Sequence, residues 1–169
     1  MRNLIRIILG AALLVPTVAC GPTGLSGGKQ LNELDADDRQ KACENLEDYY
    51  AKEIDEDTEH RFACAFVALF TTSVDECEVA YEGCLSQPLM TEETDENACE
   101  VTDETNCTAT VAEYEDCVDE QIADLRDFAD SFSCQAAVNG EITLDAEPGP
   151  ACKAVAEKCP GFFDEGAGS

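Results

Sequence analysis

Eleven cysteines are the side chains with the widest chemical scope in this chain of 169 residues. Cysteine thiolates can bind metals or act as nucleophiles, and pairs of cysteines can form disulfides. No two of them have the Cys-x-x-Cys spacing of thioredoxin-type redox sites, c-type haem attachment sites and zinc knuckles. A high cysteine content in a short chain is typical of an oxidising compartment. We therefore predict that ten of them form structural disulfides, namely Cys43, Cys64, Cys77, Cys84, Cys99, Cys107, Cys117, Cys134, Cys152 and Cys159.

The eleventh cysteine, Cys20, follows a segment with the features of an export signal. Arg2 and Arg6 precede the nine-residue apolar stretch 7–15. A permanent membrane helix needs about 20 residues, so this stretch is too short to span a bilayer. The residues around Cys20 resemble the lipobox of bacterial lipoproteins, in which small residues precede a cysteine; here they read Thr17-Val18-Ala19-Cys20-Gly21.

The lipobox resemblance implies a lipid anchor at Cys20. In that family the cysteine thiol is joined to diacylglycerol, the signal peptide (here 1–19) is removed just before it, and the new amino group is acylated. The family usually has Leu where this chain has Thr17, and ordinary signal-peptidase cleavage after Ala19 is the alternative. Lipidation leaves an even number of cysteines for disulfides. The resemblance also implies, from Gly21 in place of a retention-signal Asp, delivery to the outer membrane, facing the periplasm or the cell surface.

The net charge of −27 excludes a nucleic-acid binder that works through a basic face. From Cys20 onward, Leu, Ile, Val and Phe make up only 27 of 150 residues, or 18%. So little apolar content with so much charge would by itself predict disorder. Each disulfide, however, adds roughly 2–4 kcal/mol to the stability of a small secreted domain. We therefore predict a fold that depends on its disulfides.

Helical spacing of apolar residues and N-cap residues predicts the secondary structure. Asp35, Ser73 and Thr110 each stand where a helix should begin, and the acidic run 55–58 is typical of a turn. The predicted helices span 35–52, 58–70, 73–84, 110–130 and 150–159. The expected fold is all-α: a small disulfide-stapled bundle of four to five helices with a long acidic loop. It forms one domain over 31–169, preceded by the lipidated cysteine and a flexible glycine-rich tether over 20–30.

Two cysteine pairs, Cys77-x6-Cys84 and Cys152-x6-Cys159, have the same spacing on predicted helices. Residues seven apart lie on nearly one helix face but about 10.5 Å apart along the axis. The Cα atoms of a disulfide lie within about 7 Å of each other, so neither pair can close on itself. Each pair must therefore staple its helix twice to neighbouring parts of the chain. In an up-down arrangement of 58–70 and 73–84, Cys64 and Cys77 lie at similar heights, which favours a bond between them.

The acidic loop, residues 87–106, offers oxygen ligands for a cation. Extracellular calcium sites bind at about 10⁻⁴–10⁻³ M and use such ligands. The chain has no Asp-x-Asp-x-Asp-Gly loop. The candidate calcium ligands are Asp95, Glu96, Asp103 and Glu104, and the competing interpretation is that these charges serve solubility.

Catalysis by a serine or cysteine nucleophile needs a general base, and His60 is the single histidine of the chain. It stands between Glu59 and Arg61 near a predicted helix start, where a solvated role is expected. We therefore expect no enzymatic activity and no cofactor other than calcium.

The cysteine pattern as a whole resembles small cysteine-rich lipoproteins and secreted proteins of the kind common in myxobacteria. The relevant residues are the lipobox, Leu31-x2-Leu34, Cys77-x6-Cys84, Tyr114-x2-Cys117 and Cys152-x6-Cys159-Pro160. This resemblance implies no particular activity. The sequence thus favours a non-enzymatic, lipid-anchored envelope protein that acts as a structural or interaction module with an unidentified protein partner. The alternative is a low-affinity calcium-binding protein.

Overall fold

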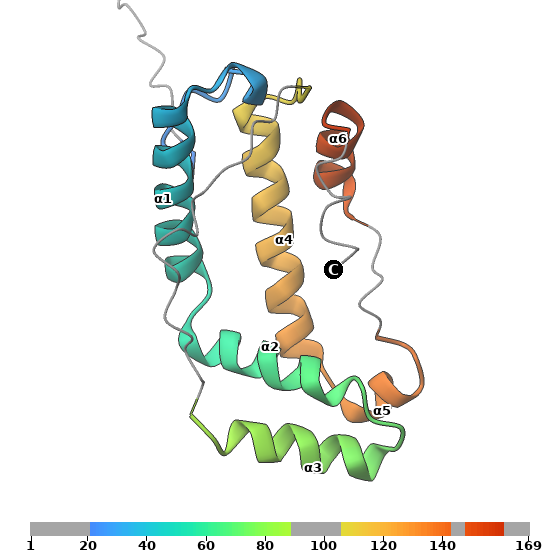
Figure 1. The fold of residues 1–169 in the computed structure, drawn as a ribbon. Coiled ribbons are helices and arrows are strands. Elements are labelled where there is room, and N and C mark those ends of the chain that lie inside the picture. Colours follow the sequence, from blue (N-terminus) through green and yellow to red (C-terminus); the bar gives the residue numbers. More distant parts are fainter. Residues whose placement is uncertain (1–20, 89–105, 143–147, 161–169) are drawn as a thin grey trace, which may run out of the picture.

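The computed structural model describes residues 21–88, 106–142 and 148–160. Within these ranges the chain forms helices and no strands, as Figure 1 shows. The elements are η1 (Leu31–Glu33), α1 (Ala36–Glu53), α2 (Glu56–Ala68), α3 (Val74–Leu85), α4 (Val111–Ser131), α5 (Cys134–Val138) and α6 (Pro150–Lys158). The prediction of a disulfide-stapled all-α fold is confirmed, with α5 and the short 3₁₀ turn η1 in addition to the predicted helices.

The helix starts follow from capping side chains. The Asp35 carboxylate accepts a hydrogen bond from the Asp38 backbone N–H at the start of α1. At the start of α4, the Thr110 hydroxyl accepts from the Glu113 N–H while the Glu113 carboxylate accepts from the Thr110 N–H, which is a capping box. These contacts satisfy N–H groups that have no partner within the helix.

Two local features differ from the sequence prediction. The acidic run 55–58 is not a turn: Asp55 caps α2 by accepting from the Thr58 N–H, and the acids after it lie in the first turn. Negative charges there favour the positive end of the helix dipole. The unpredicted α5 is capped by the Ser133 hydroxyl and has only five residues, too few to show a periodic pattern.

The long helix α4 organises the molecule. Helix α6 packs against α4, and α2 crosses the C-terminal end of α4. Helix α3 lies antiparallel to α2 and also contacts α5, near the C-terminal end of α2 (Figure 1). The buried core is divided into three small clusters, and two of these contain complete disulfides. Sulfur atoms therefore supply a large share of the buried apolar surface in this acidic chain.

Residues 21–30 differ from the predicted flexible tether. They run beside the start of α4, where the Lys29 and Gly27 carbonyls accept hydrogen bonds from the Val111 and Ala112 N–H groups. Thr23 is 1% exposed and Leu25 is 7% exposed. The segment is therefore part of the folded domain. Among the described residues, no helix is both long and apolar enough to cross a membrane.

Candidate functional site

The disulfides tie the helices together across the whole molecule. Four disulfides have both of their cysteines among the described residues, with Cα–Cα distances of 4.0–5.5 Å: Cys64–Cys84, Cys77–Cys134, Cys107–Cys159 and Cys117–Cys152. Helix α3 is joined to α2 through one cysteine and to α5 through the other. Cys152 of α6 bonds to Cys117 of α4. Cys159, which follows α6, bonds to Cys107 in the segment that leads into α4. The prediction that each x6 pair is divided between two neighbours is confirmed.

The predicted bond between Cys64 and Cys77 is wrong. Cys64 pairs with Cys84 and Cys77 pairs with Cys134. Residues 69–73 carry the chain past the end of α2 before α3 begins, so α3 is shifted along α2 (Figure 1). The shift equals seven residues, about 10.5 Å or two helical turns. It brings Cys84 opposite Cys64.

Cys43 on α1 is also disulfide-bonded. The two cysteines outside the described residues are Cys20 and Cys99. The candidate calcium ligands Asp95, Glu96, Asp103 and Glu104 also lie outside them, and so does most of the predicted acidic loop.

The residues that follow Cys20 are held by a buried carboxylate on α4. Glu115 is 7% exposed, and its Oε1 accepts from the Thr23 backbone N–H at 3.0 Å and from the Thr23 hydroxyl at 2.5 Å. A Cβ atom on Gly21 would overlap the Glu115 carboxyl group. The Asn45 side chain donates to the Thr23 carbonyl at 2.7 Å. A side chain at position 21 would therefore displace the Glu115 carboxyl group that holds Thr23.

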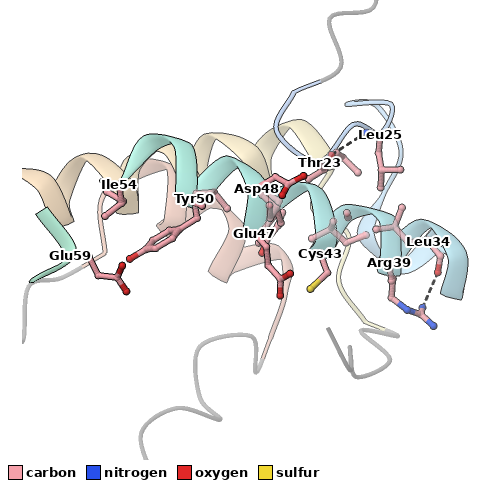
Figure 2. Close-up of a pocket in the computed structure, with 17 residues that line it drawn as sticks. Thr23, Leu25, Leu34, Arg39, Cys43, Glu47, Asp48, Tyr50, Ile54 and Glu59 are labelled. Carbon is pink, nitrogen blue, oxygen red and sulfur yellow. Dashed lines mark hydrogen bonds between the residues drawn. The ribbon is translucent and has the colours of Figure 1, made fainter. Parts of the chain in front are cut away.

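A cavity of about 850 Å³ lies between this segment, α1 and α4. Its walls are largely apolar and include Leu25, Leu34, Leu46 and Val111. Figure 2 shows the ionisable side chains of α1 at its margin, with the Arg39 guanidinium donating to the Leu34 carbonyl at 2.8 Å. The cavity could hold an apolar group, and its polar margin is mainly acidic.

Three tyrosines of α1 and α4 have raised pKa values, and two of them, Tyr50 and Tyr114, line the cavity. Burial raises the pKa of Tyr114, and burial together with the charge of Glu59 raises that of Tyr50. Tyr49, on α1, donates to the Asp119 carboxylate on α4 at 2.7 Å. This bond raises the pKa of Tyr49 to about 12, because the negative acceptor opposes ionisation of the phenol.

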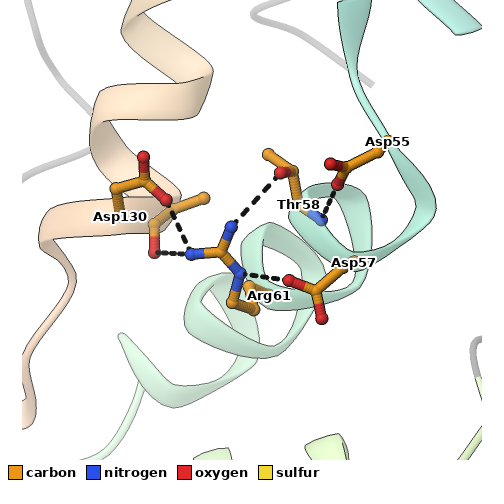
Figure 3. A network of polar contacts seen from close by, with 6 residues as sticks. Asp55, Asp57, Thr58, Arg61 and Asp130 are labelled. Carbon is orange, nitrogen blue, oxygen red and sulfur yellow. Dashed lines mark hydrogen bonds and ion pairs between the residues drawn. The ribbon is translucent and has the colours of Figure 1, made fainter. Parts of the chain in front are cut away.

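At the opposite end of α4, a polar network fixes α2 to α4 (Figure 3). The Arg61 guanidinium donates to Asp130 at 2.7 Å, to Asp57 at 3.0 Å and to the Thr58 hydroxyl at 3.2 Å. The Phe62 and Phe128 rings meet edge to face beside this network, with centroids 5.4 Å apart. Charge and ring contacts thus set the crossing of the two helices.

An aromatic pair at the C-terminal end of α2, with Phe66 in the helix and Phe70 just after it, faces solvent. Phe70 is 70% exposed and Phe66 is 41% exposed, with ring centroids 5.3 Å apart. Val67, between them in sequence, is 54% exposed. We call these three residues the α2 apolar patch. Clustered exposed apolar side chains of this kind are typical of interaction surfaces.

His60 lies beside a disulfide, contrary to the expectation that it is only a solvated helical residue. A ring nitrogen of His60 and the sulfurs of Cys64 and Cys84 all lie within 4.8 Å of one another. This is the one group of three or more histidine, cysteine or acidic side chains among the described residues with metal-binding spacing. The spacing His60-x3-Cys64 on one helix face was the signal available in the sequence.

Comparison with protein-family models, with curated proteins and with solved structures finds no match to the chain.

Proposed function

We propose that the protein is a non-enzymatic envelope protein, anchored by lipid at Cys20, that presents the far end of its helical domain to a protein partner. The export signal and the lipobox resemblance support the anchor. The even number of cysteines left for disulfides supports it independently.

The observation that carries the proposal is the opposed placement of the two ends. The segment that follows Cys20 packs at the start of α4, through the contacts of Thr23 with Glu115. The α2 apolar patch belongs to the helix that crosses the other end of α4. The 21 residues of α4 span about 31 Å. A lipid at Cys20 would therefore put the patch at the end of the domain farther from the bilayer, where a protein could reach it.

The chemistry of the patch defines the partner. Three apolar side chains, two of them aromatic, need an apolar recess for burial. The exposed residues of α2 and α3 include many acids, among them Glu56, Asp57, Glu59, Asp75 and Glu78. A partner with an apolar recess bordered by Lys and Arg would match both features.

Lipidation at Cys20 has a consequence for the disulfides. Because the Cys20 thiol would carry diacylglycerol, the partner of Cys43 would have to be Cys99. Peptide mapping by mass spectrometry without reduction should recover Cys43 joined to Cys99. A Cys43–Cys20 peptide would refute the anchor.

Metabolic labelling with a palmitate analogue tests the anchor directly. The wild-type chain should be labelled and should sediment with membranes, and Cys20→Ala should be unlabelled and released. Ser26→Ala, in the same segment, is the matched control and should behave as wild type. Labelling that persists in Cys20→Ala, or a wild-type chain without label, would refute the proposal.

Photo-crosslinking tests the interaction surface. A photoreactive amino acid at Phe70 should give a discrete adduct in the cell envelope, and the same group at Gln40, exposed on α1, should not. Phe66→Ser, introduced into the chain that carries the photoreactive amino acid at position 70, should lower the yield of the crosslinked adduct. Equal yields from both positions, or no effect of Phe66→Ser, would contradict an interaction through the patch.

Calcium binding through Asp95, Glu96, Asp103 and Glu104 is the alternative proposal. It predicts heat on calorimetric titration and a higher melting temperature at millimolar Ca²⁺. The absence of both effects would exclude it.

A further inference from the structure

The single histidine of the chain is placed against a disulfide by two separate constraints. His60 and Cys64 are four residues apart on α2, so their side chains lie one turn apart on the same face. Cys84 comes from α3 and is brought to the same place by its bond to Cys64, with Cα atoms 5.4 Å apart. One imidazole nitrogen and two sulfurs thus lie within 4.8 Å of one another.

Among the four disulfides whose two cysteines are both described, this one is the most accessible. Cys64 is fully buried, but Cys84 is partly exposed at the edge of α3. The six cysteines of the other three bonds are all buried: Cys77, Cys134, Cys107, Cys159, Cys117 and Cys152. A dissolved thiolate can therefore approach Cys84 more easily than any of those six, and access is one of the factors that set the rate of thiol–disulfide exchange.

We propose that Cys64–Cys84 is a reducible disulfide whose reduced form, together with His60, binds a thiophilic cation, Cu⁺ or Zn²⁺. Two thiolates and an imidazole are ligands that both cations accept. The disulfide bond and the cation site cannot exist at the same time, because cysteine sulfurs bind the cation as thiolates and not as a disulfide. The oxidation state of this cysteine pair would therefore switch cation binding on and off.

The redox step balances with a dithiol as reductant. A thiolate of the reductant attacks the Cys84 sulfur, the S–S bond breaks, and the electron pair leaves on the Cys64 sulfur beside His60. In the mixed disulfide, the first sulfur of the reductant is bonded to Cys84. The second thiol of the reductant then attacks that first sulfur and releases Cys84. The reductant ends as a disulfide and the protein as a dithiol. Binding of the cation then releases the two thiol protons.

The surrounding structure keeps the three ligands together after reduction. Helix α3 stays joined to α5 by Cys77–Cys134 and stays packed against α2. The His60 and Cys64 side chains keep their spacing because both belong to α2. Three protein ligands suit three-coordinate Cu⁺, and they leave a fourth position for water on tetrahedral Zn²⁺.

The first experiment determines which bond is reduced first. The full-length protein is treated with limiting dithiol, alkylated and mapped by mass spectrometry. Cys64 and Cys84 should be alkylated before Cys77–Cys134, Cys107–Cys159 and Cys117–Cys152, and Cys117–Cys152, which is fully buried, is the internal reference. Earlier alkylation of another of the four pairs would overturn the proposal.

The second experiment measures cation binding by the partly reduced chain. Zn²⁺ and Cu⁺ are titrated in separate arms, each against a competing chelator, and the tighter arm identifies the cation. His60→Gln should weaken binding roughly tenfold or more, since it removes a ligand. Glu59→Gln, the neighbouring exposed residue, should bind as wild type. Equal affinity of His60→Gln and wild type in both arms, or equal binding by the oxidised chain, would overturn the proposal.

Discussion

Glu115→Ala provides the sharpest test of how the N-terminal segment is held. The substitution removes the oxygen that accepts from both the backbone N–H and the hydroxyl of Thr23, a residue only 1% exposed. A buried donor left without a partner costs about 1–3 kcal/mol. The Thr23 hydroxyl keeps one bond, since it accepts from the Leu25 N–H at 3.2 Å. We therefore expect a loss of about 3 kcal/mol in the free energy of unfolding, in the lower half of the roughly 2–6 kcal/mol range for two donors.

Thermal unfolding followed by circular dichroism, with the disulfides intact, measures this loss. For a domain of this size, 1 kcal/mol corresponds to about 2–4 °C, so the melting temperature should fall by about 6–12 °C. Glu115→Gln retains an uncharged acceptor and should lose only about 1 kcal/mol. Asp116→Ala, an exposed neighbour on the same helix, is the control for helix propensity.

Hydrogen exchange at the Thr23 amide distinguishes local release of the segment from global destabilisation. The amide should be protected in the wild type and should lose protection in Glu115→Ala. If Glu115→Ala melts within about 1 °C of Asp116→Ala and the Thr23 amide keeps its protection, the buried carboxylate does not hold the segment.

Three further predictions concern polar contacts elsewhere on α1, α2 and α4. Hydrogen bonding to Lys158 and to the Thr110 backbone lowers the pKa of Glu113 from 4.5, so its carboxylate stabilises the fold above pH 4.5 and this contribution is lost as the pH falls through the lowered pKa. Glu113→Gln should therefore melt below wild type at pH 7, and the difference should shrink in acid; a constant difference would contradict the assignment. Ultraviolet titration should show Tyr49 ionising at about 12, and Tyr49→Phe should remove that transition. Arg61→Gln should lower the melting temperature, because Arg61 joins α2 to the end of α4; an unchanged value would show that ring packing alone holds this crossing.

Helix starts were predictable from the sequence because capping is local. The contacts of Asp35, Ser73 and Thr110 reach backbone N–H groups three residues ahead, so the residue types alone indicate them. The acidic run 55–58 is ambiguous in the sequence, because acids suit both turns and first helical turns. Only the Asp55 bond to the Thr58 N–H distinguishes the two.

The capping of α6 could not be predicted from the neighbouring sequence. Gly149 offers this helix no capping side chain, and the Glu120 carboxylate of α4 accepts from the Cys152 N–H at 3.0 Å instead. That acceptor lies 32 positions earlier in the chain. Among 37 acidic residues, nothing in sequence marks this one for the task. The same applies to Glu115, 92 positions from Thr23.

The sequence by itself determined that the described chain is helical, where most of its helices begin, and that neither x6 cysteine pair closes on itself. These conclusions follow from interactions within about one turn and from fixed distances along a helix axis. The tertiary structure alone decided that Cys64 pairs with Cys84, that His60 lies against that bond, and that residues 21–30 pack on Glu115. Those outcomes depend on how far a loop carries one helix past another, and a shift of two turns changes every partner without altering a local pattern.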